Sequence, residues 1–252
     1  MRECNDWRQA FDLQSQEHVA LVGGGGKTTT LWSLARELSA DRLTVATSTT
    51  KAGAPPADVP FVLWQPDMDT ASLFAVLEAE FMYSQLVALG NQVRDDRIQS
   101  MPPAVVDVVF AAGNVNVVNE ADGARMKPFK APAAHEPALG RTTSLAIIVI
   151  GKDAIDTSIT SDHLHRPELV MQVAGLSEGA RLTTDAIAML VQHYSSRIAD
   201  QAAAARIAVL INKADDGVDE RCEALAASLK PFVQGPIVAA AQRGDSQRWR
   251  LQ

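Results

Sequence analysis

The sequence is poor in several features that would assign a protein to a specialised class. Its 252 residues include two cysteines, Cys4 and Cys222, too few for a disulfide framework or a four-thiolate metal site. No apolar run approaches the roughly 18 residues that a membrane-spanning helix requires. The first residues, MRECNDWRQAFDLQ, lack the apolar core of a signal peptide. These absences predict a cytoplasmic protein that has no membrane partner.

The chain has fewer positive than negative side chains. It contains 23 lysines and arginines and 30 aspartates and glutamates, which gives a net charge of −7. This balance argues against a nucleic-acid partner and against binding to anionic lipid. A nucleotide site in this chain would therefore have to create its own positive field. Hydrophobic residues make up 47% of the chain, which is enough for a substantial core.

The most distinctive stretch is HVALVGGGGKTTTLWSL, residues 18–34. Glycines let backbone N–H groups surround a phosphate without Cβ clashes, and the helix that follows adds its positive dipole end. Lys27 would contact the terminal phosphates, and Thr28 would ligate Mg²⁺. A flexible glycine linker would not explain the GKTTT that follows the glycines. The stretch predicts a phosphate-binding P-loop that contacts the nucleotide through Gly23, Gly24, Gly25, Gly26, Lys27, Thr28 and Thr29.

The loop departs from the usual G-x-x-x-x-G-K-[ST] pattern, because Leu21 stands where the first glycine belongs. It matches G-G-x-G-K-[ST]-T instead, a form found in the dimer-forming ATPase and metallochaperone GTPase branch of P-loop proteins. A homodimer is therefore among the expected assemblies. That branch often has a second lysine where Val22 stands, so a two-lysine active site is not indicated.

Apolar strand-like runs alternate with helical patterns along the rest of the chain. Strands are expected at 19–22, 43–47, 61–64, 85–89, 115–119, 145–150, 207–211 and 236–240, and helices at 28–40, 70–82, 104–111, 165–174, 184–194 and 218–229. This alternation predicts an α/β fold, a doubly wound, mostly parallel sheet of the P-loop NTPase type. We expect residues 18–252 to form this single domain and residues 1–17 to form a helical extension on it. Its sites should gather at the carboxyl ends of the strands.

Two acidic residues, Glu120 and Asp122, follow the strand at 115–119. Because Mg²⁺ prefers oxygen ligands and keeps several waters, one or two carboxylates suffice for it. Asp122 is the preferred Mg²⁺ ligand beside Thr28, directly or through water. Glu120 would share this role or position an attacking water, and Lys27 completes the predicted catalytic set. The alternative is an Asp-Gly turn with an exposed carboxylate.

The sequence Asn212-Lys213-Ala214-Asp215 follows the apolar run IAVLI and has the NKxD pattern of guanine recognition. The Asp215 carboxylate can accept hydrogen bonds from the N1–H and 2-amino groups of guanine. Adenine lacks both donors, so it would leave the carboxylate unpaired. Lys213 would pack on the base, and Asn212 would brace the loop. The alternative is a polar turn that ends a strand.

Another polar group, Thr47-Ser48-Thr49-Thr50-Lys51, ends the strand at 43–47. Thr49, Thr50 and Lys51 would contact the γ-phosphate or Mg²⁺. The same side chains could instead cap the next element.

Residues 123–137 form a long, proline-rich segment, which in a compact domain is more often functional than filler. It is expected either to respond to the nucleotide state or to bind a second, anionic substrate; the alternative is a rigid surface loop. A further segment, Asp162–Glu168, would place a helix start against the site, although its His-x-His pair could instead bind a metal. The candidate substrate or switch residues are Arg125, Lys127, Lys130, His135, Glu136, His165 and Arg166.

These motifs, GGGGKTTTL, TSTTK, EADGAR…KPFKAPAAHEP and HRPE, together resemble the selenium-dependent hydroxylase accessory proteins called YqeC, a P-loop nucleotide-binding family. The resemblance extends from about residue 19 to residue 215, and the EADGAR…HEP segment is its most specific part. It implies a cytoplasmic accessory protein in the maturation of molybdenum hydroxylases, including those with a labile selenium ligand. A hydroxylase or its cofactor would then be the partner.

Three functions fit these patterns. The first is a slow, Mg²⁺-dependent GTPase or nucleotide-gated maturation factor, in which GTP (or ATP) is positioned and its charge stabilised. The second is a phosphotransferase that uses ATP or GTP to activate a small acid or cofactor precursor, held by Lys127, Lys130 and His135. The third is a module that delivers a cofactor without hydrolysing the nucleotide.

Overall fold

The structure is a computed structural model that describes residues 1–91, 93–94, 97–242 and 247–251. In that part of the chain ten strands form one sheet: β1 (Arg2–Cys4), β2 (His18–Gly23), β3 (Thr44–Ser48), β5 (Phe61–Leu63), β6 (Leu86–Gly90), β9 (Asn116–Glu120), β10 (Leu145–Gly151), β11 (Arg206–Asn212), β12 (Ile237–Ala240) and β13 (Arg248–Arg250). Their spatial order is β1-β13-β12-β11-β10-β2-β9-β3-β6-β5. The small second sheet contains β4 (Ala52–Gly53), β7 (Val93–Arg94) and β8 (Arg97–Ile98).

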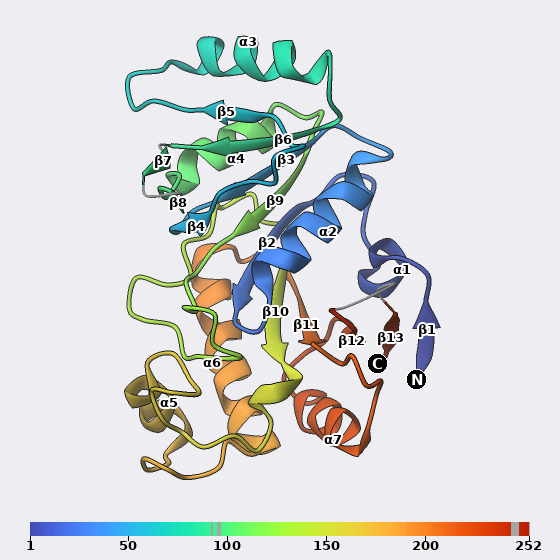
Figure 1. Ribbon diagram of the computed structural model, residues 1–252, viewed down its shortest axis with the longest axis vertical. Helices are drawn as coiled ribbons and strands as arrows, with labels where there is room; N and C mark the ends of the chain where they lie inside the picture. Colours follow the sequence, from blue (N-terminus) through green and yellow to red (C-terminus); the bar gives the residue numbers. More distant parts are fainter. Residues whose placement is uncertain (92, 95–96, 243–246, 252) are drawn as a thin grey trace.

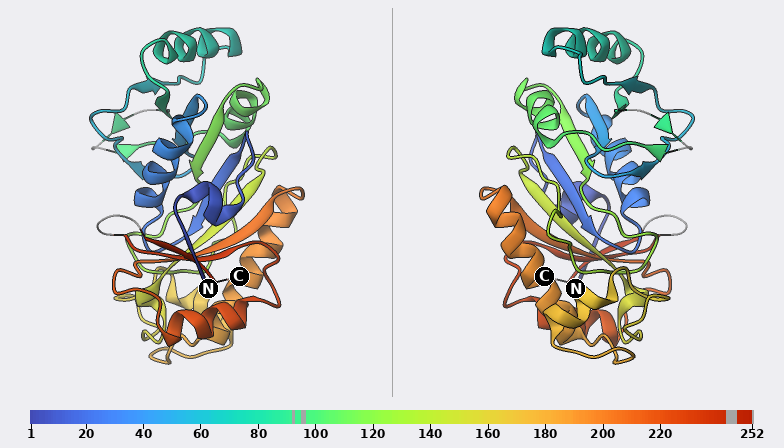
Figure 2. Two further views of the ribbon diagram at one scale, coloured as in Figure 1. Left: turned by 90° about the vertical axis from the view of Figure 1, so that its right-hand side faces the viewer. Right: turned by 90° about the vertical axis from the view of Figure 1, so that its left-hand side faces the viewer.

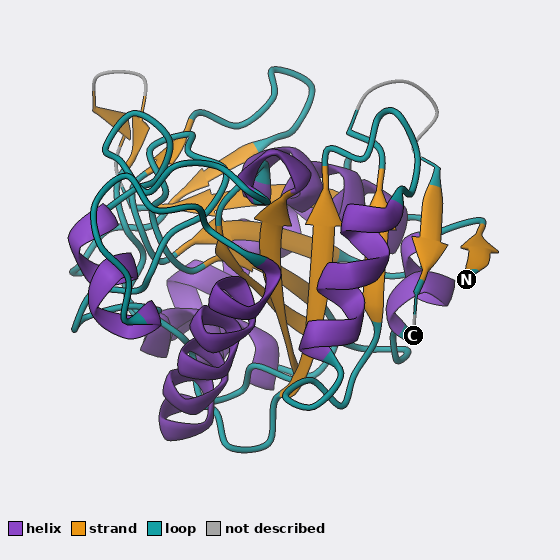
Figure 3. Ribbon diagram, turned by 90° about the horizontal axis from the view of Figure 1, so that it is seen from below, coloured by secondary structure: helices purple, strands orange, loops and turns teal. Residues whose placement is uncertain are grey.

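Helices cover both faces of the large sheet (Figures 1 and 3). They are α1 (Trp7–Phe11), α2 (Lys27–Ser39), α3 (Thr70–Phe81), α4 (Pro103–Ala111), α5 (Pro167–Ala174), α6 (Thr184–Gln201) and α7 (Glu220–Leu229), with a short 3-10 helix at Lys152–Ala154. From β12 to β5 the paired strands of this sheet run parallel. The expected α/β fold with a large, mostly parallel central sheet is confirmed.

The central strand β10 shows why the sheet is covered on both sides. All seven of its residues, LAIIVIG, are buried. Ile148 and its alternate neighbours pack with α5, α6 and α7, whereas Ile147 and its alternate neighbours pack with α1 and α2. A continuous apolar run is therefore stable here, since successive side chains enter two different cores.

The helices begin where the sequence provides capping groups. The Asp69 side chain accepts the Ser72 N–H at the start of α3, and Asp219 does the same for Cys222 at the start of α7. Such caps satisfy N–H groups that have no partner inside the helix. No helix within the described residues is long and apolar enough to cross a membrane.

The two chain ends lie side by side, as both views in Figure 2 show. Strand β13 pairs antiparallel with β12 and also with β1, so it joins the N-terminal segment to the large sheet. The expected helix within residues 1–17 is present as α1. The two edge strands β1 and β13 were not expected, because three-residue strands leave almost no periodic signal.

Strand order brings the predicted motifs together at the carboxyl edge of the sheet. Strand β2 lies between β10 and β9, and β3 follows β9. Leu21 in β2 and Ser48 in β3 both pair in register with Glu120 in β9. The P-loop, the TSTTK group and the acidic pair therefore emerge next to one another.

Candidate functional site

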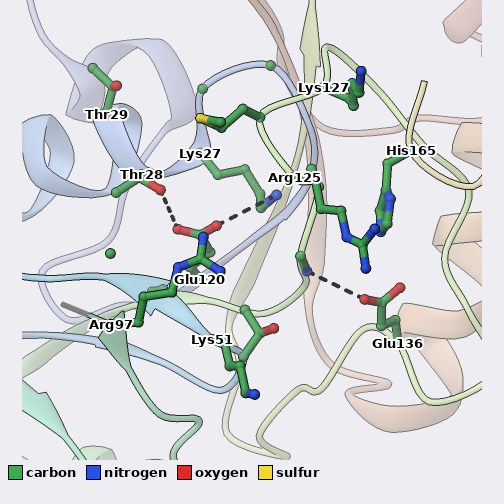
Figure 4. A pocket seen from close by; sticks show the side chains of 18 of the residues that line it. Lys27, Thr28, Thr29, Lys51, Arg97, Glu120, Arg125, Lys127, Glu136 and His165 are labelled. Atoms are coloured by element: carbon green, nitrogen blue, oxygen red, sulfur yellow. Dashed lines mark hydrogen bonds and ion pairs between the residues drawn. The ribbon is translucent and has the colours of Figure 1, made fainter. Parts of the chain in front are cut away.

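A cavity of about 680 Å³ opens at this edge of the sheet (Figure 4). Its lining combines the start of α2 with the ends of β3 and β9, the segment after β9 and the residues before α5. The lining residues are Gly25, Gly26, Lys27, Thr28, Thr29, Thr50, Lys51, Ala52, Gly53, Arg97, Glu120, Gly123, Ala124, Arg125, Met126, Lys127, His135, Glu136, His165, Arg166, Lys213 and Gln242.

The glycine loop is held in a shape that only glycine fits. Gly25 and Gly26 have φ angles of 79° and 115°, in the left-handed region. A Cβ on Gly25 would lie 2.2 Å from the nitrogen of Gly151, and one on Gly26 would lie 2.4 Å from the Asn212 amide. The Gly25 N–H also donates to the Lys127 carbonyl at 2.9 Å. The P-loop is thus packed directly against the segment that follows β9.

Lys27, the first residue of α2, is buried and turns its ammonium toward three oxygen atoms. Nζ donates to the Gly23 carbonyl at 2.7 Å and lies 3.2 Å from Asp122 Oδ1 and 3.7 Å from Glu120 Oε1. Burial opposes a charged ammonium, but the Asp122 and Glu120 carboxylates hold the pKa of Lys27 above its ordinary value. Lys27 therefore stays protonated at the end of the P-loop, where the two carboxylates balance its charge.

Thr28 and Glu120 provide oxygen atoms at the start of the same helix. The Thr28 hydroxyl donates to Glu120 Oε2 at 2.8 Å, and both side chains line the cavity. Burial raises the pKa of Glu120 above its ordinary value, while Lys27 and the Thr28 hydroxyl oppose this rise. A hydroxyl and a carboxylate at one point form a hard donor set that fits Mg²⁺.

Asp122 lies behind this surface, because its side chain is fully buried and does not line the cavity. Oδ2 accepts the Gly23 N–H at 3.1 Å and the Tyr194 hydroxyl at 2.7 Å, and it lies 3.4 Å from Lys130 Nζ. Burial and the adjacent Asp122 carboxylate raise the pKa of Tyr194 well above its ordinary value, so the phenol stays a donor. Glu120, not Asp122, is the acidic side chain that a metal in the cavity would meet first.

Glu136 connects the long segment to α5. Its Oε2 accepts hydrogen bonds from Lys130, from the Ala133 N–H at 3.0 Å and from Arg166. Burial alone would raise the pKa of Glu136, but the Ala133 N–H and the Lys130 ammonium lower it to about 2. Because Lys130 is fully buried, this ion pair fixes the segment in one arrangement.

The cavity is strongly cationic although the chain is acidic. Among the described residues that line it, Glu120 and Glu136 are the carboxylates, and the fixed cations are Lys27, Lys51, Arg97, Arg125, Lys127, Arg166 and Lys213. Four lining residues have positive φ angles despite carrying side chains: Arg125, Met126, Arg166 and Lys213. Such conformations cost about 1–2 kcal/mol each and are concentrated at functional sites.

The NKxD residues lie on the other side of the P-loop. The Asn212 amide donates to the Gly25 carbonyl at 2.8 Å, so it braces the loop as the sequence suggested. Lys213 lines the cavity and pairs with Asp153 at 2.8 Å. Asp215 is exposed and accepts the Gln242 N–H at 2.6 Å, but it does not line the cavity. Guanine recognition by Asp215 stays a prediction.

Most of the predicted site residues line the cavity. Those that do not are Gly23, Gly24, Thr49, Asp122, Lys130, Asn212 and Asp215. Thr49 is buried, and its hydroxyl donates to the Ala138 carbonyl at 2.6 Å, so it holds the segment after β9 and does not face the cavity.

Three residues with evident roles were missed. Arg97 and Gln242 line the cavity, and Tyr194 supports Asp122 from behind. A tyrosine on the apolar face of a helix signals a buried hydroxyl that needs a partner, which would have drawn attention to Tyr194. Arg97 lies in a two-residue strand, so no periodic pattern marks it.

The described residues contain no cluster of three or more histidine, cysteine, aspartate or glutamate side chains that could hold a metal ion. The His-x-His alternative therefore gains no support. A Mg²⁺ ion does not need such a cluster, because it is usually bound by one or two carboxylates together with phosphates and water.

Comparisons with known proteins agree with the resemblance seen in the motifs. The family model for the YqeC protein matches residues 19–168. A protein of Escherichia coli (strain K12), described as "Uncharacterized protein YqeC", is 30% identical over 189 residues, covering 73% of this chain and 72% of that protein. The matched region includes the P-loop, the acidic pair and the long segment up to the start of α5. The chain belongs to the YqeC family.

Proposed function

We propose that this protein binds a nucleoside triphosphate with Mg²⁺, that GTP is the favoured nucleotide, and that hydrolysis is slow. The main support is one geometric fact: Lys27, Thr28 and Glu120 face one cavity at the N-terminus of α2. The first N–H groups of a helix have no partner inside it and attract phosphate. This combination is what a triphosphate with its metal requires.

Each residue has a defined role in the proposal. Lys27 would contact the terminal phosphates with its ammonium, and Asp122 would keep that ammonium charged and oriented from behind. The Thr28 hydroxyl and the Glu120 carboxylate would hold Mg²⁺, with Asp122 acting indirectly. When bound, the metal supplies charge neutralisation at the β- and γ-phosphates. Glu120 would also be placed to orient an attacking water.

The biological role we propose follows the family resemblance. The protein would act as an accessory factor in the maturation of molybdenum- or selenium-dependent hydroxylases. The segment 124–137 would report the nucleotide state, since its Lys127 carbonyl is bonded to the P-loop at Gly25. A phosphotransferase remains the second candidate, favoured by the additional cations around Arg125.

Competition binding tests the nucleotide assignment. A fluorescent GTP analogue would be bound with Mg²⁺ and displaced by unlabelled GTP or ATP. We expect GTP to displace it at a concentration at least about tenfold lower, because guanine offers Asp215 the N1–H and 2-amino donors that adenine lacks. Equal displacement by ATP would overturn the guanine preference.

The Lys27→Ala variant tests the P-loop itself. We expect it to lose triphosphate binding, whereas Lys230→Ala, which removes an exposed lysine that does not line the cavity, should bind normally. Unchanged binding by Lys27→Ala would refute the P-loop assignment. Phosphate release with and without candidate acceptors then separates hydrolysis from transfer.

A further inference from the structure

One side of the cavity has positive charge that the triphosphate site does not account for. Lys27 is assigned to the terminal phosphates at the P-loop, and Lys213 pairs with Asp153 near the NKxD residues. Lys51 and Arg97 adjoin Ala52 and Ile98, which border Thr28 and Glu120 in a smaller pocket, so they belong to the triphosphate side. The other three cations, Arg125, Lys127 and Arg166, come from the segment after β9 and the start of α5. In Figure 4, Arg125 and His165 lie across the cavity from Thr28 and Thr29.

Among the described residues, Arg166 is the one of these five cations that pairs with a carboxylate. Arg166 pairs with Glu136, and Lys127 donates to the Asp162 carbonyl at 2.5 Å. For Lys51, Arg97 and Arg125, the described residues provide no hydrogen bond or ion pair, and all three are exposed. Like charges that share a concave site repel one another unless an anion lies between them.

The positive charges around the cavity also affect the pKa of His165. Burial, followed by the charges of Arg166, Lys130 and Arg125, lowers the pKa of His165 to about 4, with Glu136 opposing weakly. The imidazole is therefore neutral at pH 7 and can both donate and accept a hydrogen bond. Its backbone N–H donates to the Phe129 carbonyl at 3.3 Å, which couples His165 to the segment that carries Arg125.

We infer that this side of the cavity binds a second ligand, a multiply charged oxyanion that is separate from the triphosphate. We call it the second anion site and define it as Arg125, Lys127 and His165, which lie across the cavity from Thr28 and Thr29 (Figure 4). The planar guanidinium group of Arg125 suits a phosphate or carboxylate group, which it can bind through two parallel N–H donors. The inference deepens the proposed function and rests on it, because the triphosphate is assigned to the P-loop side.

The test uses the full-length protein saturated with a non-hydrolysable GTP analogue and Mg²⁺. Inorganic phosphate, and separately malonate, would be titrated by calorimetry, so that the phosphate and carboxylate classes are distinguished. We expect one of them to bind once per chain without displacing the analogue. Arg125→Ala and Lys127→Ala should each weaken that binding about tenfold or more, as for the loss of a charge-assisted hydrogen bond. Lys230→Ala should leave it unchanged.

Two further measurements make the outcome decisive. Binding of the dianion should raise the pKa of His165, which can be followed by NMR of its ring protons. In Lys27→Ala, which cannot use the P-loop, the oxyanion should still bind and still depend on Arg125. Competition between the oxyanion and the analogue, or equal oxyanion binding by wild type and Arg125→Ala, would overturn the second anion site. If the oxyanion binds but the GTP analogue does not, the result would overturn the triphosphate assignment and leave the second anion site in place.

Discussion

The phenolic oxygen of Tyr194 lies 2.7 Å from Oδ2 of Asp122, and both side chains are fully buried. The same carboxylate accepts the N–H of Gly23 and faces the ammonium of Lys27. Helix α6 is therefore connected to the P-loop through one side chain. A buried carboxylate is tolerated only when it is paired and hydrogen-bonded, so each of these donors supports the others.

Replacing Tyr194 with phenylalanine should destabilise the protein by about 1–3 kcal/mol, the cost of leaving a buried charged acceptor short of a donor. The free energy of unfolding, measured by urea denaturation, provides the value. Tyr83→Phe is the matched control, because Tyr83 is 91% exposed. Its change should stay within about 0.5 kcal/mol. Equal effects in the two variants would show that the Asp122 contact contributes nothing.

Glu136→Gln should also destabilise the protein, and the loss should depend on pH. The pKa of Glu136 is about 2 in the folded protein, below the ordinary value of 4.5, so its charged form stabilises the fold. That stabilisation is fully present above about pH 4.5 and disappears as the pH falls toward 2. We expect a difference on the order of 2 kcal/mol at pH 7, allowing for solvent screening.

Denaturation series at several pH values check this prediction. Wild-type stability should fall more steeply than that of Glu136→Gln between about pH 4.5 and 2, because only the wild type has this carboxylate to protonate. Glu168→Gln, at an exposed position on α5, should follow the wild type. Parallel curves for wild type and Glu136→Gln would contradict the stabilising role of the ion pair with Lys130.

Mg²⁺-dependent nucleotide binding should weaken in mildly acidic solution. Burial raises the pKa of Glu120, so protonation begins at a higher pH than for an ordinary glutamate. A proton on Glu120 competes with the metal, and affinity should fall as the pH drops toward that raised pKa. Glu120→Gln should bind nucleotide with Mg²⁺ about tenfold or more weakly and should lack this pH dependence. Titrations from pH 8 to 5, with Glu168→Gln as control, measure it.

Part of the site could be predicted because its signals are local. The glycines, Lys27 and Thr28 form a contiguous motif between an apolar strand and an amphipathic helix. The motif residues Glu120 and Asn212 each end an apolar strand, and carboxyl ends of parallel strands meet at one edge of the sheet. Local pattern and general topology were therefore sufficient to bring these residues together.

The different roles of Glu120 and Asp122 could not be predicted in this way. They are two residues apart, and which one faces the cavity depends on Tyr194 and Lys130 surrounding Asp122 from other elements. Burial of that kind is a property of tertiary packing, not of the sequence EADG. The edge strands β1 and β13 were missed for a related reason, since a three-residue strand is defined by its partner.

The proposed preference for guanine can be tested by a substitution at Asp215. An aspartate accepts from both the N1–H and the 2-amino group of guanine, whereas an asparagine amide can donate to the 2-carbonyl of xanthine. Asp215→Asn should therefore lose affinity for GTP by about tenfold or more and gain affinity for xanthosine triphosphate. Competition against a fluorescent analogue measures both changes. Asp200→Asn, which removes an equal charge from an exposed position on α6, should keep the wild-type preference. An undiminished preference for GTP in Asp215→Asn would mean that another group, such as the cavity-lining Gln242, contacts the base.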